Sequence, residues 1–257
     1  MSNPNDVIEG LRAKLGFRSS PDGLRAVIEQ LIKSKSGPVE VIEKLMAMEV
    51  RERDTRNLKT RTTMATLGSF KTINQFDWNH PKSIDRGLYD ELHEMHFINR
   101  HDNVLIRGSS GLGKTTLAQN LGLAALLTGY TVRFSTLAAV LADLLKQESL
   151  PAFERRLKRY LLPDLLILDE LGYLPCDSRS ADLLYNIISR RHERASTVIT
   201  TNLAFKQWST VFPGAACVVA MVDRFSQHCH VIDIDGESWR QREPAEPRIP
   251  PNKRHKH

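Results

Sequence analysis

Cysteine is scarce in this chain of 257 residues, which has three, at positions 176, 217 and 229. They lie too far apart for a CxxC pair, and three cysteines cannot all pair with one another, so neither a disulfide framework nor a structural zinc site is predicted. The run His228-Cys229-His230 does not change this, because alternate residues at the start of a strand face one side without a third or fourth ligand nearby.

Long hydrophobic runs are also lacking. No apolar stretch approaches the roughly 18 residues that a membrane span needs, and the first residues, MSNPNDVIEG, lack the basic and then apolar pattern of a signal peptide. Together with the few cysteines, this leads us to expect a soluble protein of the cytoplasm.

The chain does contain apolar residues, 41% of the total, which is enough for one sizeable core and a small accessory domain. Its formal charge of +6 favours anionic partners such as nucleic acid.

Three regions are expected. Residues 1–69 comprise a small helical domain and a basic linker. The helical part has apolar residues at helical spacing over 6–15, 21–33 and 38–48, and the basic linker or extended arm covers 49–71. That arm is interpreted as either a DNA clamp or a solvated linker. Residues 70–240 form an α/β domain, and residues 241–257 form a basic, proline-rich tail.

The α/β region shows short β-branched and leucine-rich runs that alternate with helical stretches, a pattern typical of βαβ units. It predicts a five-stranded parallel sheet, with strands at 103–107, 130–135, 165–169, 197–201 and 231–234. Helices are expected at 115–127 and 178–194, and a helical insertion between the second and third strands at 138–147 and 151–162.

The most specific motif lies between the first strand and the helix that follows it. It matches GxxxxGK[ST], the P-loop, whose glycines let backbone N–H groups converge on phosphates at a helix N-terminus. Lys114 is expected to reach the β and γ phosphates of ATP, and the Thr115 hydroxyl to hold Mg²⁺. The predicted nucleotide-binding residues are Gly108, Ser109, Ser110, Gly111, Leu112, Gly113, Lys114, Thr115 and Thr116.

Two acids end the third strand, at the sheet edge where ligands of parallel sheets bind. Asp169 is predicted to hold Mg²⁺, and Glu170 to polarise the water that attacks the γ-phosphate; neighbouring strand residues point to opposite faces and cannot share one role. The alternative is a pair of acids that caps the following turn. Asn202 ends the next strand and is predicted to orient that water, or else is an ordinary turn residue.

These motifs, GSSGLGKT, LLILDELGYLP, TVITTN, Asp223-Arg224-Phe225 and the final GESWR of the α/β region, resemble the AAA+ ATPases. Within them the chain is similar to the clade of the DnaA initiator and the DnaC helicase loader, and most similar to the IstB transposition helper ATPases. The resemblance covers about residues 70–240 and implies an ATP-dependent oligomer with nucleotide at subunit boundaries.

The resemblance also implies roles for two arginines. Arg224 corresponds to the arginine finger that a neighbouring subunit receives, against the alternative of a surface arginine; Arg240 corresponds to the second sensor arginine, which acts in its own subunit. Only 17 residues, with four prolines, follow Arg240, so the C-terminal helical lid of most AAA+ proteins is expected to be largely absent.

The insertion carries a cationic face that suits contacts with the phosphate backbone, or else is a solvated helix face. The predicted DNA-binding residues are Lys146, Arg155, Arg156, Lys158 and Arg159.

The resemblance implies an ATPase that assembles on duplex DNA, largely independently of sequence, and assists an integrase-type transposase. The alternative is a DnaC-like loader that holds single-stranded DNA. A small-molecule P-loop kinase fits less well, because Asp169, Glu170 and Asn202 suit water activation.

Overall fold

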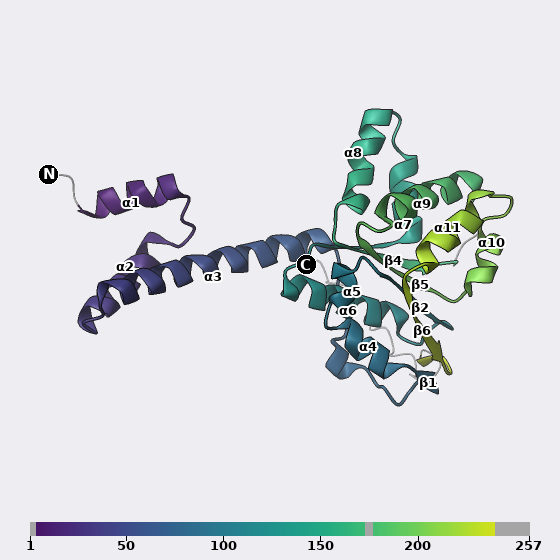
Figure 1. The fold of residues 1–257 in the computed structure, drawn as a ribbon, viewed down its shortest axis with the longest axis horizontal. Coiled ribbons are helices and arrows are strands. Elements are labelled where there is room, and N and C mark those ends of the chain that lie inside the picture. Colours follow the sequence, from purple (N-terminus) through teal and green to yellow (C-terminus); the bar gives the residue numbers. More distant parts are fainter. Residues whose placement is uncertain (1–3, 173–176, 240–257) are drawn as a thin grey trace, which may run out of the picture. The chain divides into compact units, whose positions relative to one another are not determined.

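The computed structural model describes residues 4–172 and 177–239, and the chain divides into two compact units with the boundary between Thr63 and Met64 (Figure 1). We call them the N-terminal unit and the C-terminal unit. Within the described residues, no helix is long and apolar enough to cross a membrane.

The N-terminal unit is helical, as predicted. Helix α1 spans Pro4–Leu15, α2 spans Pro21–Lys33 and α3 begins at Pro38. Ser20 begins α2 as its N-cap, since its hydroxyl accepts a hydrogen bond from the Gly23 amide at 3.1 Å.

The predicted basic linker is wrong for most of its length, because α3 continues to Ala65. No glycine or proline interrupts residues 39–67, and the charged residues that suggested a solvated arm are good helix formers. Their charges also pair one turn apart, as in Glu49–Arg53 at 2.8 Å. Helix α3 ends before Thr66, which has a positive φ of 54°.

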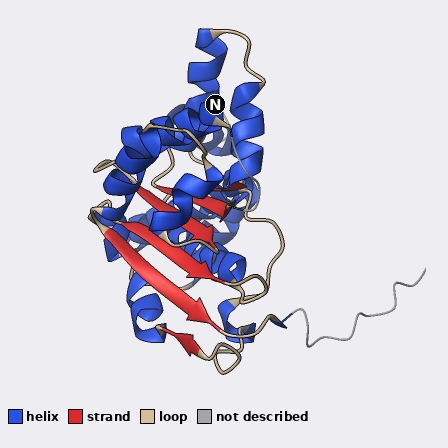
Figure 2. Cartoon of the chain, turned by 90° about the vertical axis from the view of Figure 1, so that its right-hand side faces the viewer, coloured by secondary structure: helices blue, strands red, loops and turns tan. Residues whose placement is uncertain are grey.

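The C-terminal unit is built on a mixed sheet of six strands in the order β1-β6-β2-β5-β4-β3, rather than on five parallel strands (Figure 2). The five predicted strands are all present and pair in parallel; the extra strand, β1, pairs antiparallel with β6. Two residues are too short to show a strand pattern. The strands are β1 Ser83–Ile84, β2 Asn103–Gly108, β3 Val132–Thr136, β4 Leu165–Leu171, β5 Ser196–Thr201 and β6 Cys229–Asp235.

Helices cover both faces of the sheet (Figure 2). Helix α6 packs on β2 to β5, and a Cβ on its Gly122 would lie 2.8 Å from Ile167. The other helices of this unit are α4 Arg86–Leu92, α5 His96–Asn99, α6 Lys114–Thr128, α7 Leu137–Leu145, α8 Leu150–Leu161, α9 Ser178–Arg191, α10 Trp208–Val211 and α11 Cys217–Ser226, with short 3-10 turns η1 Ile73–Gln75 and η2 Phe205–Gln207.

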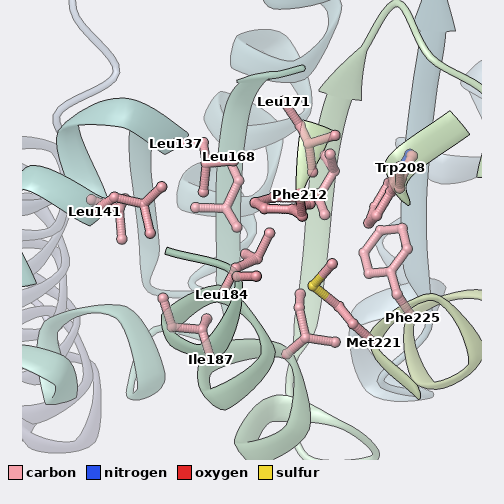
Figure 3. Close-up of a cluster of buried hydrophobic side chains, with 14 of the residues drawn as sticks. Leu137, Leu141, Leu168, Leu171, Leu184, Ile187, Trp208, Phe212, Met221 and Phe225 are labelled. Carbon is pink, nitrogen blue, oxygen red and sulfur yellow. The ribbon is translucent and has the colours of Figure 1, made fainter. Parts of the chain in front are cut away.

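Successive side chains along a strand point to opposite faces of the sheet, so each face packs a different set of residues. Leu166 and Leu168 of β4 and Ile199 of β5 join one hydrophobic cluster with residues of α7, α9, α10 and α11 and with Phe212, which follows α10. Leu184, Trp208, Met221 and Phe225 are among the helix residues (Figure 3). Ile167, between the two leucines, packs toward α6 instead. Burial on both faces explains why β4 reads as a continuous apolar run.

Candidate nucleotide-binding site

The P-loop connects β2 to α6, as predicted, and its backbone depends on glycine. Gly111 and Gly113 have φ of 82° and 83°, values that L side chains rarely adopt. A Cβ on Gly113 would lie only 2.6 Å from Phe76 Cε2. Lys114 begins α6, and its Nζ donates to the Ser109 carbonyl at 2.8 Å. The lysine side chain therefore turns back toward the start of the P-loop.

The segment after β6 folds back on the same loop. The Trp239 amide donates to the Gly111 carbonyl at 3.1 Å, and Ser238 lies where a Cβ of Gly111 would be. The P-loop is therefore held in place by a segment that lies about 130 residues further along the chain.

Asp169 connects the ends of β4 and β5 to the P-loop. Its two carboxylate oxygens each lie 3.0 Å from the Thr115 hydroxyl, and the Thr200 hydroxyl also donates to Asp169. The carboxylate is buried, with 3% of the residue exposed. The Thr200 hydroxyl in turn accepts a hydrogen bond from the Glu170 amide at 3.0 Å, so this threonine holds both acids; sequence reasoning missed it.

The strand does not continue straight through the two acids. Glu170 has a φ of 64°, and the register between β4 and β5 shifts between Leu168 and Leu171. A non-glycine residue in the left-handed region is strained, and such strain gathers at functional sites. Because of this irregularity, Glu170 is exposed and lines the cavity while Asp169 is buried against Thr115.

A cavity of about 350 Å³ brings most of the predicted site residues together. It is lined by Ser110 to Thr116 of the P-loop and the start of α6, by Glu170 and Leu171 at the end of β4, and by Thr200, Thr201 and Asn202 at the end of β5 and just beyond it. Asn202 and Glu170 thus border one space, as the predicted pairing of their strands requires.

The cavity also has aromatic walls that the sequence did not reveal. Phe76, His80 and Trp239 line it, and the His80 and Trp239 rings meet edge to face with centroids 4.6 Å apart. Phe76, Trp78 and His80 precede the P-loop by about 30 residues, a spacing that carries no motif of its own.

The donors beside the P-loop suit magnesium. A hard cation of this size takes oxygen ligands, often one or two carboxylates together with a hydroxyl and phosphate oxygens. Thr115 and Asp169 supply such oxygens within one hydrogen-bonded group, next to the backbone amides of the P-loop.

Arg224 lies on α11 and is not among the residues that line this cavity within the described parts of the chain. Its guanidinium contacts Tyr185 of α9 instead. Arg240 lies outside the described residues, so its predicted role stays a prediction.

Four of the five predicted DNA-binding cations are exposed: Lys146 follows α7, and Arg155, Lys158 and Arg159 share one face of α8. Arg156 points elsewhere: its Nε donates to Asp143 of α7 at 2.6 Å, beside Tyr160, which donates to the same carboxylate. The hydrogen bond from Arg156 holds the pKa of Asp143 below its usual value. Arg156 therefore fastens α8 to α7.

The mixed sheet, the P-loop and the acids at the ends of its strands define an ATP-binding protein of the AAA+ class, as the sequence motifs predicted. The fold resembles that of AMPPCP-bound DnaA from Aquifex aeolicus, with a TM-score of 0.55 and 20% identity over 66% of this chain and 51% of that one. It also resembles DnaI, with a TM-score of 0.54 and 18% identity over 63% of this chain and 90% of that one.

Sequence comparison gives the family. A model described as IstB-like ATP binding protein matches residues 13–246, and the chain belongs to this family. The ATP-binding protein of insertion sequence IS21 from Pseudomonas aeruginosa is 33% identical over 236 residues, 92% of this chain and 89% of the relative. That of insertion sequence IS5376 from Geobacillus stearothermophilus is 34% identical over 204 residues, 79% of this chain and 81% of the relative.

Proposed function

We propose that this chain hydrolyses ATP with Mg²⁺ and, in its ATP-bound form, assembles on duplex DNA and assists an integrase-type transposase. The observation that carries the proposal is the single hydrogen-bonded group of Thr115, Asp169 and Thr200, which sets the P-loop beside Glu170 in one cavity. The insertion-sequence relatives support the link to transposition.

In this proposal each residue has a separate task. The P-loop amides and Lys114 bind the β and γ phosphates at the positive end of α6. Thr115 and Asp169 would hold Mg²⁺, which neutralises charge on the phosphate oxygens. Glu170 polarises the attacking water, Asn202 orients it, and Arg224 of a neighbouring copy contacts the γ-phosphate.

DNA contacts are assigned to the exposed cations of the insertion. Arg155, Lys158 and Arg159 lie on one side of α8, and Lys146 precedes it; such a face binds phosphates without reading bases. Arg156 is left out of this set, because its pairing with Asp143 already engages it.

Hydrolysis is tested with two variants. Lys114→Ala should lose ATP binding. Glu170→Gln should bind ATP with nearly unchanged affinity but turn it over at least about 100-fold more slowly, because the general base is gone. Glu148→Gln, an exposed glutamate outside the cavity, is the matched control and should behave as wild type. Normal turnover by Glu170→Gln would remove that residue from its role.

DNA binding is tested by titrating labelled duplex and single strand with ATP, ADP or no nucleotide. Changing Lys146, Arg155, Lys158 and Arg159 to glutamine should reduce the slope of log affinity against log salt by about 0.9 for each duplex phosphate that the variant no longer neutralises. A variant with the same charge change elsewhere, at Lys82, Arg179, Arg194 and Lys206, should keep the slope. Equal binding of duplex under all three nucleotide conditions contradicts ATP-dependent assembly.

Assistance to a transposase is measured as strand transfer by an integrase-type transposase, with wild-type chain or Lys114→Ala. We expect stimulation by the wild type alone. The resemblance of the sequence motifs to the DnaC clade keeps a helicase loader as the second candidate. Preference for single-stranded DNA, without any stimulation of strand transfer, would favour the loader.

A further inference from the structure

Arg224 and Tyr185 form a pair between α11 and α9. The Arg224 guanidinium carbon lies 5.0 Å from the centre of the Tyr185 ring, over its face, and Nη1 donates a hydrogen bond to the Tyr185 hydroxyl. The pair therefore combines a cation–π contact with a charge-assisted hydrogen bond, at two different parts of the guanidinium. This hydrogen bond also lowers the pKa of Tyr185.

Both residues stand on firmly packed helices. Helices α9 and α11 pack against each other, and the neighbours of the pair, Leu184 and Phe225, are fully buried in the hydrophobic cluster (Figure 3). The Tyr185 ring itself packs against that cluster. Packing thus fixes the position of the Tyr185 ring, and this ring can restrain the long Arg224 side chain, which has many rotamers of its own.

The contact matters because an unrestrained arginine side chain loses conformational entropy when it binds a phosphate. An arginine side chain carries about 2 kcal/mol of rotamer entropy, and immobilising it when two surfaces meet costs part of the binding free energy. A guanidinium has five N–H donors, so a hydrogen bond from Nη1 to Tyr185 leaves others for phosphate oxygens.

We infer that Tyr185 is a positioning residue for Arg224: it holds the guanidinium in place before a neighbouring copy of this chain presents its nucleotide. The inference rests on the role proposed above for Arg224 at a neighbour's γ-phosphate. Tyr185 does not touch the nucleotide itself, and it acts only through Arg224.

The test measures ATP turnover by full-length protein, assembled on duplex DNA at saturating ATP, for Tyr185→Phe, Arg224→Ala and the double variant. Arg224→Ala should lower kcat by about 1,000-fold or more. Tyr185→Phe keeps the ring and removes the hydroxyl, and should lower kcat about fivefold, the size of one missing side-chain restraint, with KM for ATP unchanged. The double variant should be no slower than Arg224→Ala, because Tyr185 has nothing left to position.

Tyr130→Phe is the matched control. Tyr130 is a partly exposed tyrosine of the same unit whose hydroxyl donates to Asn99 at 2.7 Å, and its variant should keep wild-type kcat. Thermal unfolding and sedimentation of each variant check that fold and assembly are intact.

The outcomes separate the two claims. Wild-type turnover by Arg224→Ala removes the finger, and the role of Tyr185 with it. A slow Arg224→Ala beside an unaffected Tyr185→Phe leaves the finger in place and overturns only the positioning role. A further loss in the double variant, as large as the loss that Tyr185→Phe causes alone, shows that Tyr185 acts through the fold and also overturns it.

Discussion

The C-terminal unit buries Trp208, Phe212 and Phe225 together on one face of its sheet (Figure 3), whereas the N-terminal unit buries a carboxylate, that of Glu49. Glu49 is 5% exposed and accepts hydrogen bonds from the Arg18 and Ser19 amides at 2.8 and 3.0 Å and from Arg53 Nε at 2.8 Å. It thereby ties the loop between α1 and α2 to α3.

The apolar residues of the N-terminal unit could not do this alone. Leu24 and Leu31 of α2 are its buried leucines among the described side chains, while Val39, Ile42, Met46 and Val50 form an exposed stripe along α3. A small unit buries a small fraction of its surface, so a few polar contacts decide its stability. In a large hydrophobic core, replacing a side chain by a smaller one lowers the stability in proportion to the volume removed. In a unit held by a buried carboxylate, removing one hydrogen-bond partner or the charge itself removes most of that stabilisation at once.

The largest effect is expected from Trp208→Ala. Trp208 is fully buried and its ring lies 5.4 and 5.8 Å from those of Phe205 and Phe225, so its removal should cost the C-terminal unit about 4 kcal/mol of unfolding free energy. Urea unfolding, followed through the NMR amide signals of each unit, measures this. The signals of the N-terminal unit should keep their midpoint.

Trp208→Phe sharpens the test. The Trp208 indole Nε1 is buried and has no hydrogen-bond partner among the described residues, so phenylalanine removes an unsatisfied donor while it keeps most of the apolar volume. Its cost should stay below about 1.5 kcal/mol. If Trp208→Ala and Trp208→Phe lower the unfolding free energy equally, the stability at this site does not depend on the apolar volume that fills it.

Glu49→Gln should produce the next largest effect, about 3 kcal/mol, confined to the N-terminal unit. The amide cannot carry the negative charge that Arg53 and the two backbone amides face, and one of its ends is a donor where acceptors are needed. Glu43→Gln, an exposed glutamate on the same helix, is the control and should stay within about 0.5 kcal/mol of wild type. If Glu49→Gln and Glu43→Gln have the same unfolding free energy, the hydrogen bonds of Glu49 do not stabilise the N-terminal unit.

Acid should weaken the same contact by a smaller amount. Burial by itself raises the pKa of Glu49, but the hydrogen bonds from Arg53, Ser19 and Arg18 outweigh it and lower the pKa to about 2 from 4.5. A lowered pKa in the folded state gives stability that is present above pH 4.5 and is lost as the pH falls toward 2. The advantage of wild type over Glu49→Gln should therefore shrink by about 2 kcal/mol between pH 6 and pH 3, in urea titrations at both values. A constant difference would contradict the low pKa.

Local patterns carried much of the sequence prediction. The P-loop, the five long strands and the two acids at the end of β4 are each contiguous in sequence, and the structure brings Lys114, Thr115, Glu170 and Asn202 together around one cavity. The left-handed backbone of Glu170 and the contact of Thr200 with Asp169 arise from the register between β4 and β5, which no single segment records.

The errors have a related cause. The charge of residues 49–71 suggests a solvated arm, but charge does not break a helix when propensity and spacing favour one, and α3 continues to Ala65. The aromatic walls of the cavity, Phe76 and Trp239, meet the P-loop only because the chain folds back there from both sides. Sequence periodicity describes one element at a time, so contacts of this kind escape it.

The smallest effect compares the same local interaction in the two units. Ser20 begins α2 and Thr136 begins α7, and their hydroxyls accept hydrogen bonds from Gly23 and Ala139 amides at 3.1 and 3.2 Å. Either residue changed to alanine should cost its own unit about 1 kcal/mol, because an N-cap acts locally whatever the surrounding core. Ser20→Asp and Thr136→Ser, which can still cap, should restore most of it. A markedly larger loss for Ser20→Ala would mean that the loop held by Glu49 depends on this cap too, and that the N-terminal unit responds as one polar network rather than as separable contacts.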